Sequence, residues 1–343
     1  MTITIVTTMR NEGAHLLEWI AHHRAAGVSG FLVYVNDCDD DTEALLRLLP
    51  GVEVVRQEAG KKPPQWTALK AAWDHPMVTD SDWVACIDCD EFLNVNSDLG
   101  GIPHLIENIG GDAILLPWRL FGHNGQAEIS DAATTMRFTK AAAEDMLYPA
   151  IGSFFKTLFR RAGPFRQLGV HRPRQKNPDR HGLPAFHDGS GAELSGPVVA
   201  NDGQIMHWGQ SIARDLVQLN HYSLRSAAEF MVKRSRGLPN HQSKQIDLTY
   251  WVERNFNTVE DTSIAHMRAG TEKVLAEYLA IKGVREAQQA CRQWQRDRFA
   301  ELMRDEVSLK LYGRLLLAGG SDTLPRDIAL QLVNAYRGLD AKS

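Results

Sequence analysis

The sequence contains no long hydrophobic run. Across 343 residues, no segment approaches the roughly 18 consecutive apolar residues that a membrane-spanning helix requires. The first residues, MTITIVTTMRNEG, lack the basic start, apolar stretch and cleavage site of an export signal, so we expect their apolar residues to form a strand. The expected location is therefore the cytoplasm, with peripheral attachment to a membrane left open.

The lack of excess positive charge and the small number of cysteines exclude further classes of protein. The formal net charge of -4 lacks the basic excess that phosphate-backbone binding needs, so nucleic acid is not an expected partner. The four cysteines give neither a disulfide framework nor the paired ligands of structural zinc. Cys86 and Cys89 form a C-x-x-C, but along one extended strand this separation points them to opposite faces. We therefore expect no redox or zinc chemistry there.

The first third of the chain alternates β-rich and helical patterns, which is typical of a parallel sheet wound with helices. The expected strands are 3–8, 30–35, 52–56 and 83–88, and the expected helices are 14–26, 42–49 and 65–73. Gly27 stands where a left-handed helix cap belongs. Ligands of such sheets bind beyond the carboxyl ends of the strands, so we expect functional residues there.

The rest of the chain divides into a strand-rich and a helical part. Strands are expected in AILLPW, SFFKTLFR and GQIMHWG, and helices in 250–259 and 265–310. Ser226-Ala-Ala-Glu229 matches a capping box at the start of another helix. The predicted organisation is one domain over 1–237, with a nucleotide-binding half 1–95 and an acceptor half 96–237, followed by a helical region 238–343.

The most distinctive segment is WVACIDCDEF, an apolar run that leads into Asp88, Asp90 and Glu91. Neighbouring carboxylates repel one another, so such a cluster needs a cation or solvent exposure to persist. If the segment is extended, Asp88 and Asp90 lie on one face and address the same metal-bound ligand. Oxygen ligands favour Mg²⁺ or Mn²⁺. The alternative is an ordinary acidic turn.

Several motifs in order resemble one known family. The runs TTMRNEGAHLLEWIAHHRAAGVSGFLVYVND, WVACIDCDEF, PWRLFGHNG and LNHYSLRSAAEFMVKRSRG are similar to family 2 glycosyltransferases, in the branch close to family 92, over residues 3–237. The resemblance implies a GT-A fold: a Rossmann-like mixed sheet flanked by helices, here with a helical C-terminal extension. It also implies sugar transfer from a nucleoside-diphosphate sugar, with uridine as the expected base, to a saccharide or other hydroxyl, with inversion.

The same resemblance assigns the donor site. Asp90 ligates a divalent cation, Mn²⁺ or Mg²⁺. Asp88 is assigned to the same metal site and reaches the ribose or the metal water, and Glu91 supports the pair. A cation neutralises the charge that develops on a diphosphate leaving group, which agrees with this assignment. The expected nucleotide contacts are Thr8, Arg10, Glu12, Asn36, Asp37 and Gln65. The alternatives are charge complementarity at a helix start for Glu12 and an exposed salt bridge for Arg10.

Two histidines stand out by context. His221 resembles the C-terminal histidine that ligates the metal in many GT-A enzymes, and Arg225, Lys233 and Arg236 follow it as candidates to neutralise the diphosphate. His171 lies roughly where family 2 members carry the acidic general base, but no Glu-Asp pair stands there. His171 is therefore the candidate base, with binding of the donor phosphate or the acceptor as alternatives.

The acceptor is expected at two segments. Trp118, Phe121 and Gly122 are candidates for a platform that stacks on a sugar, with core packing as the alternative for Phe121. Residues 156–180 hold eight Lys or Arg and one acid, Asp179, which predicts either a positive patch or a solvated loop. We expect a polar acceptor between this stretch and residues 118–125, with Trp118 and Arg172 as its test residues.

Two rival functions and one rival metal site differ from this interpretation in the residues that they require. Sugar-nucleotidyl or phosphosugar transferases need a glycine-rich basic loop after the first strand, and TTMRNEG has one glycine. A non-catalytic nucleotide-sugar-binding protein does not require Asp88, Asp90 and His221 together. The spacing Asp37-x-Asp39-x-Asp41 imitates a calcium loop, but Thr42 and Leu48 stand where that loop needs glycine and an acid, so calcium is excluded there.

Overall fold

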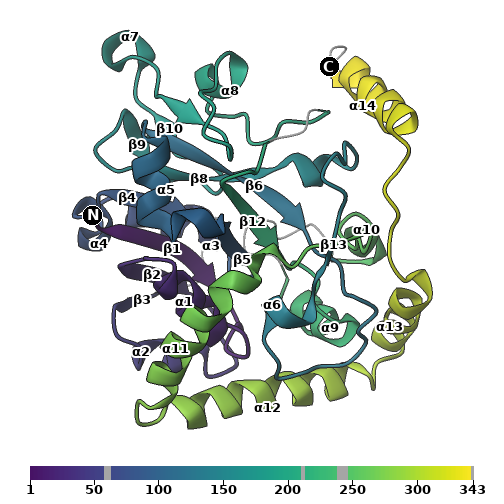
Figure 1. The fold of residues 1–343 in the computed structure, drawn as a ribbon. Helices are drawn as coiled ribbons and strands as arrows, with labels where there is room; N and C mark the ends of the chain where they lie inside the picture. Colours follow the sequence, from purple (N-terminus) through teal and green to yellow (C-terminus); the bar gives the residue numbers. More distant parts are fainter. Residues whose placement is uncertain (58–62, 210–212, 238–245, 341–343) are drawn as a thin grey trace.

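A mixed β-sheet forms the centre of the molecule (Figure 1). The structure, a computed structural model, describes residues 1–57, 63–209, 213–237 and 246–340. The sheet has the order β3-β2-β1-β4-β8-β6-β12-β5, with β11 beside β6. Its strands are β1 Ile3–Met9, β2 Gly30–Val35, β3 Val52–Arg56, β4 Trp83–Cys86, β5 Glu91–Val95, β6 Ala113–Leu120, β8 Phe155–Arg160, β11 Phe186–His187 and β12 Val217–His221. The first four strands in chain order are parallel, as expected.

Helices cover both faces of the sheet, because alternate side chains of its buried strands point to opposite faces. Ile5 and Val33 join the core cluster that includes α1 Leu16–Ala25 and α2 Thr42–Arg47. Val6 and Leu32 join the cluster that includes α3 Pro64–Ala72 and α4 Pro76–Thr79. Helix α5, Ile102–Ile109, packs in the first cluster. The predicted α/β class is confirmed.

Helix α1 closes the edge of strand β5 with its side chains. Trp19 Nε1 donates to the Glu91 carbonyl at 2.7 Å, and His22 Nε2 lies 2.7 Å from the Leu93 carbonyl. His23 Nε2 accepts from the Leu93 N–H at 3.2 Å. An unpaired strand edge exposes backbone polar groups, and these three side chains satisfy them. Gly27, expected to end this helix, has φ +107°, in the left-handed range.

One predicted strand is wrong. GQIMHWG, residues 203–209, forms only an isolated bridge between Met206 and Phe154. Strand β8, next to this bridge, already pairs with β4 and β6 on its two edges, so it offers no free edge to a further strand. Short strands outside the sheet form two antiparallel pairs in the described part of the chain: β7 Lys140–Ala141 with β13 Val259–Glu260, and β9 Phe165–Gln167 with β10 Arg174–Gln175.

Helices dominate the end of the chain. They are α9 Ala227–Arg236, α10 Leu248–Val252, α11 Arg268–Leu279, α12 Val284–Leu302, α13 Glu306–Ala318 and α14 Arg326–Asp340, preceded by the short α6 Thr134–Arg137, α7 Pro178–His181 and α8 Pro197–Ala200. Three 3₁₀ turns lie at η1 Ser97–Leu99, η2 Ala150–Ser153 and η3 Ser263–Met267. None of the described helices is long and apolar enough to cross a membrane.

Two predicted helices differ from the structure. The helix expected over 250–259 ends at Val252, because the chain then pairs Val259 with Ala141. The helix expected over 265–310 is divided into η3, α11, α12 and α13. Gly283, at φ +89°, precedes α12, and the Asp305 side chain caps α13. The predicted domain boundary at 237/238 touches residues 238–245, which lie outside the described residues.

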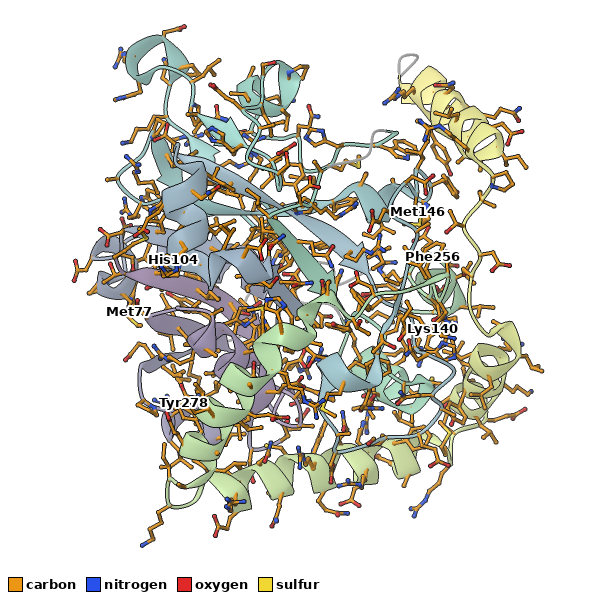
Figure 2. All side chains as sticks on the ribbon, in the orientation of Figure 1. Met77, His104, Lys140, Met146, Phe256 and Tyr278 are labelled. Atoms are coloured by element: carbon orange, nitrogen blue, oxygen red, sulfur yellow. The ribbon has the colours of Figure 1, made fainter. Side chains whose placement is uncertain are left out.

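The C-terminal helices pack back onto the first half of the chain. Helix α11 lies against α1, and α12 lies against α9 and α2 (Figure 1). The hydroxyl of Tyr278, labelled in Figure 2, accepts a hydrogen bond from Arg24 Nε at 3.3 Å. Phe230, Trp251 and Leu315 share a further buried cluster between α9, α10 and α13. Helix α9 is therefore held between the sheet and the C-terminal helices.

Candidate functional site

The acidic segment Asp88–Glu91 forms a tight turn between β4 and β5. The Glu91 N–H donates to the Asp88 carbonyl at 3.0 Å, and the Asp88 N–H donates to Glu91 Oε2 at 2.7 Å. The prediction of one extended segment over WVACIDCDEF is therefore wrong, because reciprocal backbone and side-chain hydrogen bonds close the turn. Asp88 and Asp90 consequently contact different partners.

A buried lysine neutralises the Asp88 side of the turn. Lys156 Nζ lies 3.0 Å from Asp88 Oδ2 and 3.6 Å from Glu91 Oε2, and it donates to the Val170 carbonyl at 3.0 Å. Gln65 Nε2 donates to Asp88 Oδ1 at 3.2 Å. Lys156 has no exposed side-chain surface. Sequence reasoning missed Lys156 as a site residue, although a lysine inside the apolar run SFFKTLFR was the available signal.

The Asp90 side of the turn is neutralised from a different part of the chain. Lys233 of α9 donates from Nζ to Asp90 Oδ2 at 2.6 Å and to the Ser223 carbonyl at 2.7 Å. His221, the last residue of β12, places Nε2 3.6 Å from Asp90 Oδ1. The capping box predicted at Ser226 is confirmed and fixes the start of α9, so Lys233 reaches the turn from a defined helix.

Adjacent carboxyls of the turn have opposite electrostatic environments. Burial would raise the pKa of Asp90, but Lys233 and His221 outweigh it and hold that pKa well below its usual value. Burial raises the pKa of Glu91 well above its usual value, because Lys156 offsets burial only in part while Asp88 and Asp90 add repulsion. At neutral pH, Asp90 therefore keeps its charge more strongly than Glu91 does.

Asp90 and His221 together fit a divalent cation. Burial lowers the pKa of His221, so the imidazole is neutral near pH 7 and can act as a ligand. Two ligands at about 2.1 Å from one ion lie roughly 3 to 3.6 Å apart, and the measured separation is 3.6 Å. Within the described residues, no group of three or more His, Cys, Asp or Glu side chains is arranged to hold a metal ion. Asp88, the third predicted ligand, faces Lys156 instead.

The arginines that follow His221 surround Glu12. Arg225 Nη1 lies 3.4 Å from Glu12 Oε2, and Arg236 forms an ion pair with Glu12 Oε1. Arg225 also donates to the Cys89 carbonyl at 3.3 Å, inside the acidic turn. All of these side chains are largely buried. Glu12 thus links the loop after β1 to α9, and the predicted nucleotide residues Glu12, Arg225 and Arg236 lie together.

The remaining predicted nucleotide residues lie at the ends of β1 and β2. These strands are parallel neighbours, so Thr8 and Arg10 follow the same sheet edge as Asn36 and Asp37. Arg10 Nε donates to the Asp37 carbonyl at 3.0 Å. The buried Thr8 hydroxyl has no hydrogen-bond partner among the described residues. Asn11 and Asp37 have φ of +52° and +47°, and this conformation bends both loops at the sheet edge.

Trp118 connects the acidic turn to the predicted acceptor region. Its ring centroid lies 4.2 Å from that of His221, 5.4 Å from that of His171 and 5.5 Å from that of Phe154. Phe121 is fully buried and packs on Tyr222, as the core alternative predicted. A side chain at Gly122 would collide with Phe256 and Asn257. Trp118 is also buried, with 6% of its surface exposed, and of the three predicted platform residues it is the one that packs beside His221.

His171 has a clear hydrogen-bonding state but a low basicity. Its Nδ1 lies 2.9 Å from the Phe155 carbonyl and must donate to it, which leaves Nε2 as an acceptor. Burial and the nearby Lys156 lower the pKa of His171 to about 3. A general base works best when its pKa lies near the operating pH. This environment favours a hydrogen-bonding role over proton removal.

The basic stretch 156–180 does not form one surface patch. Lys156 is fully buried, and Arg172 is 3% exposed. Arg172 donates to the carbonyls of Val198, Asn201 and Gln204. Its pairing with Trp118 on an acceptor surface is therefore wrong, since the guanidinium crosslinks a loop inside the protein.

Comparisons with known proteins support the resemblance over part of the chain. The chain is similar to a glycosyltransferase family 92 protein of Ricinus communis, with 29% identity over 98 residues, which is 28% of this chain and 17% of that protein. The chain thus matches less than a fifth of that relative's length. No protein-family model matches the chain.

Two solved structures also align with part of the chain. S. aureus TarS 1–349 aligns with a TM-score of 0.32 and 15% identity over 47% of this chain and 48% of that chain. Glucosyl-3-phosphoglycerate synthase from Mycobacterium tuberculosis, in complex with Mn²⁺, uridine diphosphate and phosphoglyceric acid, aligns with a TM-score of 0.26 and 23% identity over 34% and 43% of the two chains. The similarity to family 92 glycosyltransferases expected from the motifs is thus confirmed for about a quarter of the sequence.

Proposed function

We propose that this chain is a glycosyltransferase that takes a sugar from a nucleoside-diphosphate sugar, with uridine diphosphate as the carrier, and transfers it to a hydroxyl group. The observation that carries the proposal is the cluster of Asp90, His221 and Lys233 beyond the carboxyl ends of β4 and β12. Ligands of open α/β sheets bind at such edges. The partial similarity to family 92 glycosyltransferases supports the same class.

In this proposal, Asp90 and His221 hold a divalent cation, Mn²⁺ or Mg²⁺. When bound, the cation neutralises negative charge on the diphosphate leaving group. Asp90 suits this role because its pKa is held low, so the ligand stays charged. Asp88 retains one third of its side-chain surface, and we assign it to the donor ribose together with Gln65.

Positive side chains around the turn contribute the remaining charge. Lys233 contacts Asp90 directly, and its ammonium is placed to share its protons with a diphosphate bound beside Asp90. Arg225 and Arg236 pair with Glu12, and they add positive potential at the same edge. Thr8, Arg10, Asn36 and Asp37 are assigned to the nucleoside, because they follow β1 and β2 at this edge.

We place the acceptor against Trp118. Its indole lies beside both His221 and His171, and an indole face is a suitable surface for the apolar side of a sugar ring. His171 Nε2 accepts a hydrogen bond from the attacking hydroxyl and so orients it. The acceptor oxygen forms a bond to the anomeric carbon as the bond from that carbon to the diphosphate breaks, which inverts the configuration. The hydroxyl proton passes to solvent water, and the diphosphate leaves with the bonding electron pair.

A thermal-shift panel tests the proposal. Binding to the native state raises the melting temperature by mass action, so uridine diphosphate with Mn²⁺ should stabilise the protein more than either alone. Adenosine and guanosine diphosphates serve as matched controls for the base. Absence of any shift with every nucleotide, with and without Mn²⁺, would contradict the proposal.

A second assay separates an enzyme from a binding protein. Incubation with uridine-diphosphate sugars and Mn²⁺ should release uridine diphosphate by transfer or slow hydrolysis, and Asp90→Asn should abolish that release. Binding without release in the presence of a broad set of hydroxyl acceptors would favour the non-catalytic alternative.

A further inference from the structure

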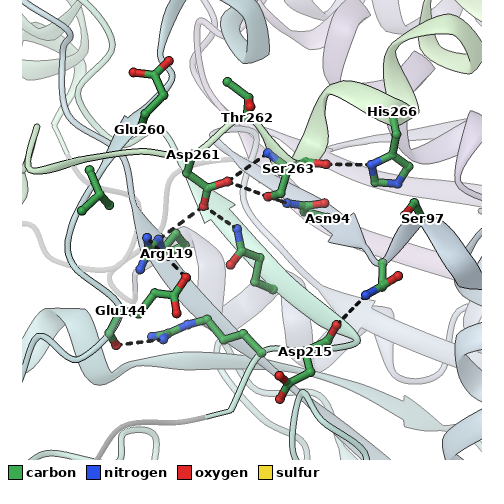
Figure 3. Close-up of a pocket in the computed structure, with 14 residues that line it drawn as sticks. Asn94, Ser97, Arg119, Glu144, Asp215, Glu260, Asp261, Thr262, Ser263 and His266 are labelled. Atoms are coloured by element: carbon green, nitrogen blue, oxygen red, sulfur yellow. Dashed lines mark hydrogen bonds and ion pairs between the residues drawn. The ribbon is translucent and has the colours of Figure 1, made fainter.

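A polar pocket lies between the sheet and the segment that leads into α11 (Figure 3). Its volume is about 640 Å³, and it is lined by Asn94 of β5, Arg119 of β6 and Gln218 of β12. These residues alternate along their strands with Leu93, Trp118 and Leu219, so they point the other way. Residues 259–263, which run from β13 into η3, and His266 of η3 close the other side of the pocket.

The pocket contains arginine donors that lack partners. Arg119 is 3% exposed, and its Nη1 has no hydrogen-bond partner among the described residues. Arg214 uses its two terminal nitrogens on the carbonyls of Glu144 and Trp118, while its buried Nε is likewise without a partner in the described part of the chain. Buried donors without partners are costly and usually indicate a missing ligand or water.

The lowered pKa values of both arginines agree with a site that lacks a ligand. Burial and repulsion from Arg119 lower the pKa of Arg214 to about 10. Burial also lowers the pKa of Arg119, although its Nε lies 3.4 Å from Asp261 Oδ2. Oxygen acceptors placed between the two guanidinium groups would satisfy both.

Acceptors surround these donors in the same pocket. Asp261 is held by Ser263 and Gln218 and contacts Arg119 (Figure 3). Glu144 lies 4.0 Å from Arg119 and keeps 85% of its side-chain surface exposed. Counting Asp215 and Glu260, four carboxylates and two arginines line the pocket. This excess of negative charge excludes a polyanion such as nucleic acid.

Hydroxyl groups satisfy both the arginine donors and the carboxylate acceptors of the pocket, since each hydroxyl accepts from a guanidinium and donates to a carboxylate. We propose that this pocket binds a neutral, polyhydroxylated ligand, a saccharide unit, at a site separate from the sugar-transfer site. Arg119 and Arg214 donate to its hydroxyls, and Asp261 and Glu144 accept from them. The inference rests on the pocket alone and does not require the proposed function.

Ligand-observed saturation-transfer NMR tests this site with a defined panel: the methyl glycosides of glucose, galactose, mannose and N-acetylglucosamine, with glucose 6-phosphate as an anionic arm. We expect at least one neutral glycoside to bind with a Kd of about 1 mM. The variant Thr262→Trp places an indole at an exposed lining position and should weaken this binding about 10-fold or more.

Two controls make the result decisive. Glu144→Gln removes an exposed carboxylate without changing side-chain size, and it should weaken glycoside binding while leaving the melting temperature unchanged. Lys310→Met changes an exposed residue of α13 that does not line the pocket, and it should leave glycoside binding unchanged. Failure of every neutral glycoside to bind, a preference for glucose 6-phosphate, or unchanged binding in Thr262→Trp would overturn the proposal. Nucleotide binding is measured separately, so its outcome is independent.

Discussion

Each side of the Asp88–Glu91 turn pairs a carboxylate with a lysine, but the two lysines differ in their surroundings. On one side, Lys156 lies in the sheet without exposed surface and faces Asp88 and Glu91. On the other side, Lys233 comes from α9 and shares Asp90 with His221. If Lys156 is removed, Asp88 and Glu91 keep neutral hydrogen-bond donors, the Gln65 amide and the Asp88 N–H, whereas Asp90 without Lys233 keeps Arg225 and His221. We infer that Lys156 stabilises the turn and that Lys233 serves the ligand.

The largest expected effect comes from removing the lysine that stabilises the turn. Lys156→Met leaves buried carboxyls without their cation, so the free energy of unfolding should fall by about 3–5 kcal/mol. Denaturant unfolding followed by circular dichroism measures this loss. Lys233→Met is the matched comparison and should lose clearly less. Equal losses would remove the distinction between the two sides.

The second prediction concerns the lysine that serves the ligand. Lys233→Met removes a charged donor from the proposed diphosphate site, so affinity for uridine diphosphate should fall about 10-fold or more. Uridine, which has no phosphate, should bind the variant as it binds the wild type. The exposed Lys310, paired with Glu306 on α13, provides the control variant Lys310→Met. Unchanged diphosphate affinity in Lys233→Met would place the phosphates elsewhere.

The third prediction concerns His221, which lies on the same side of the turn as Lys233 and Asp90. If it ligates the cation, His221→Ala should raise the Mn²⁺ concentration needed for half-maximal nucleotide binding by about 10-fold. Folding should survive, because α9 keeps its own cap at Ser226. A sharp loss of melting temperature with unchanged metal dependence would instead mean that His221 is a packing residue, like the buried His22 and His23.

The smallest expected effect is a dependence of stability on pH that originates outside the turn. Burial lowers the pKa of His22 to about 4, so above pH 6.5 both folded and unfolded chains hold it neutral. As pH falls from about 6.5 toward 4, the unfolded chain takes up the proton first, and stability falls by about 1.4 kcal/mol per pH unit. His22→Gln should reduce this slope, while the exposed His104→Gln should not. Identical slopes in His22→Gln and wild type would show that His22 contributes nothing to it.

The sequence predicted local elements well where one residue type dictates the conformation. Strands 30–35 and 52–56 coincide with β2 and β3, and the Ser226 capping box begins α9 as expected. These features depend on β-branched runs and on capping chemistry within four residues. Each is contained in a short window of sequence, so no knowledge of distant neighbours was needed.

Features that depend on distant partners could not be predicted in this way. The side chain of Glu91 closes the turn, but its cation comes from Lys156, 65 residues later. The run 203–209 has a strand-like pattern, yet the neighbouring strand β8 has no free edge for it. Arg172 was expected on a surface and instead crosslinks a loop. Tertiary partners decide each of these cases, and a local pattern does not specify them.

The central claim is that Asp90, on the Lys233 side of the turn, supports metal-dependent binding of a nucleoside diphosphate. Isothermal titration of uridine diphosphate into wild type, Asp90→Asn and Asp88→Asn, each with and without Mn²⁺, tests it most directly. The account predicts that Mn²⁺ strengthens binding to wild type, that Asp90→Asn loses about 100-fold in affinity with Mn²⁺, and that Asp88→Asn loses less. Mn²⁺-independent binding of equal affinity in wild type and Asp90→Asn would contradict it.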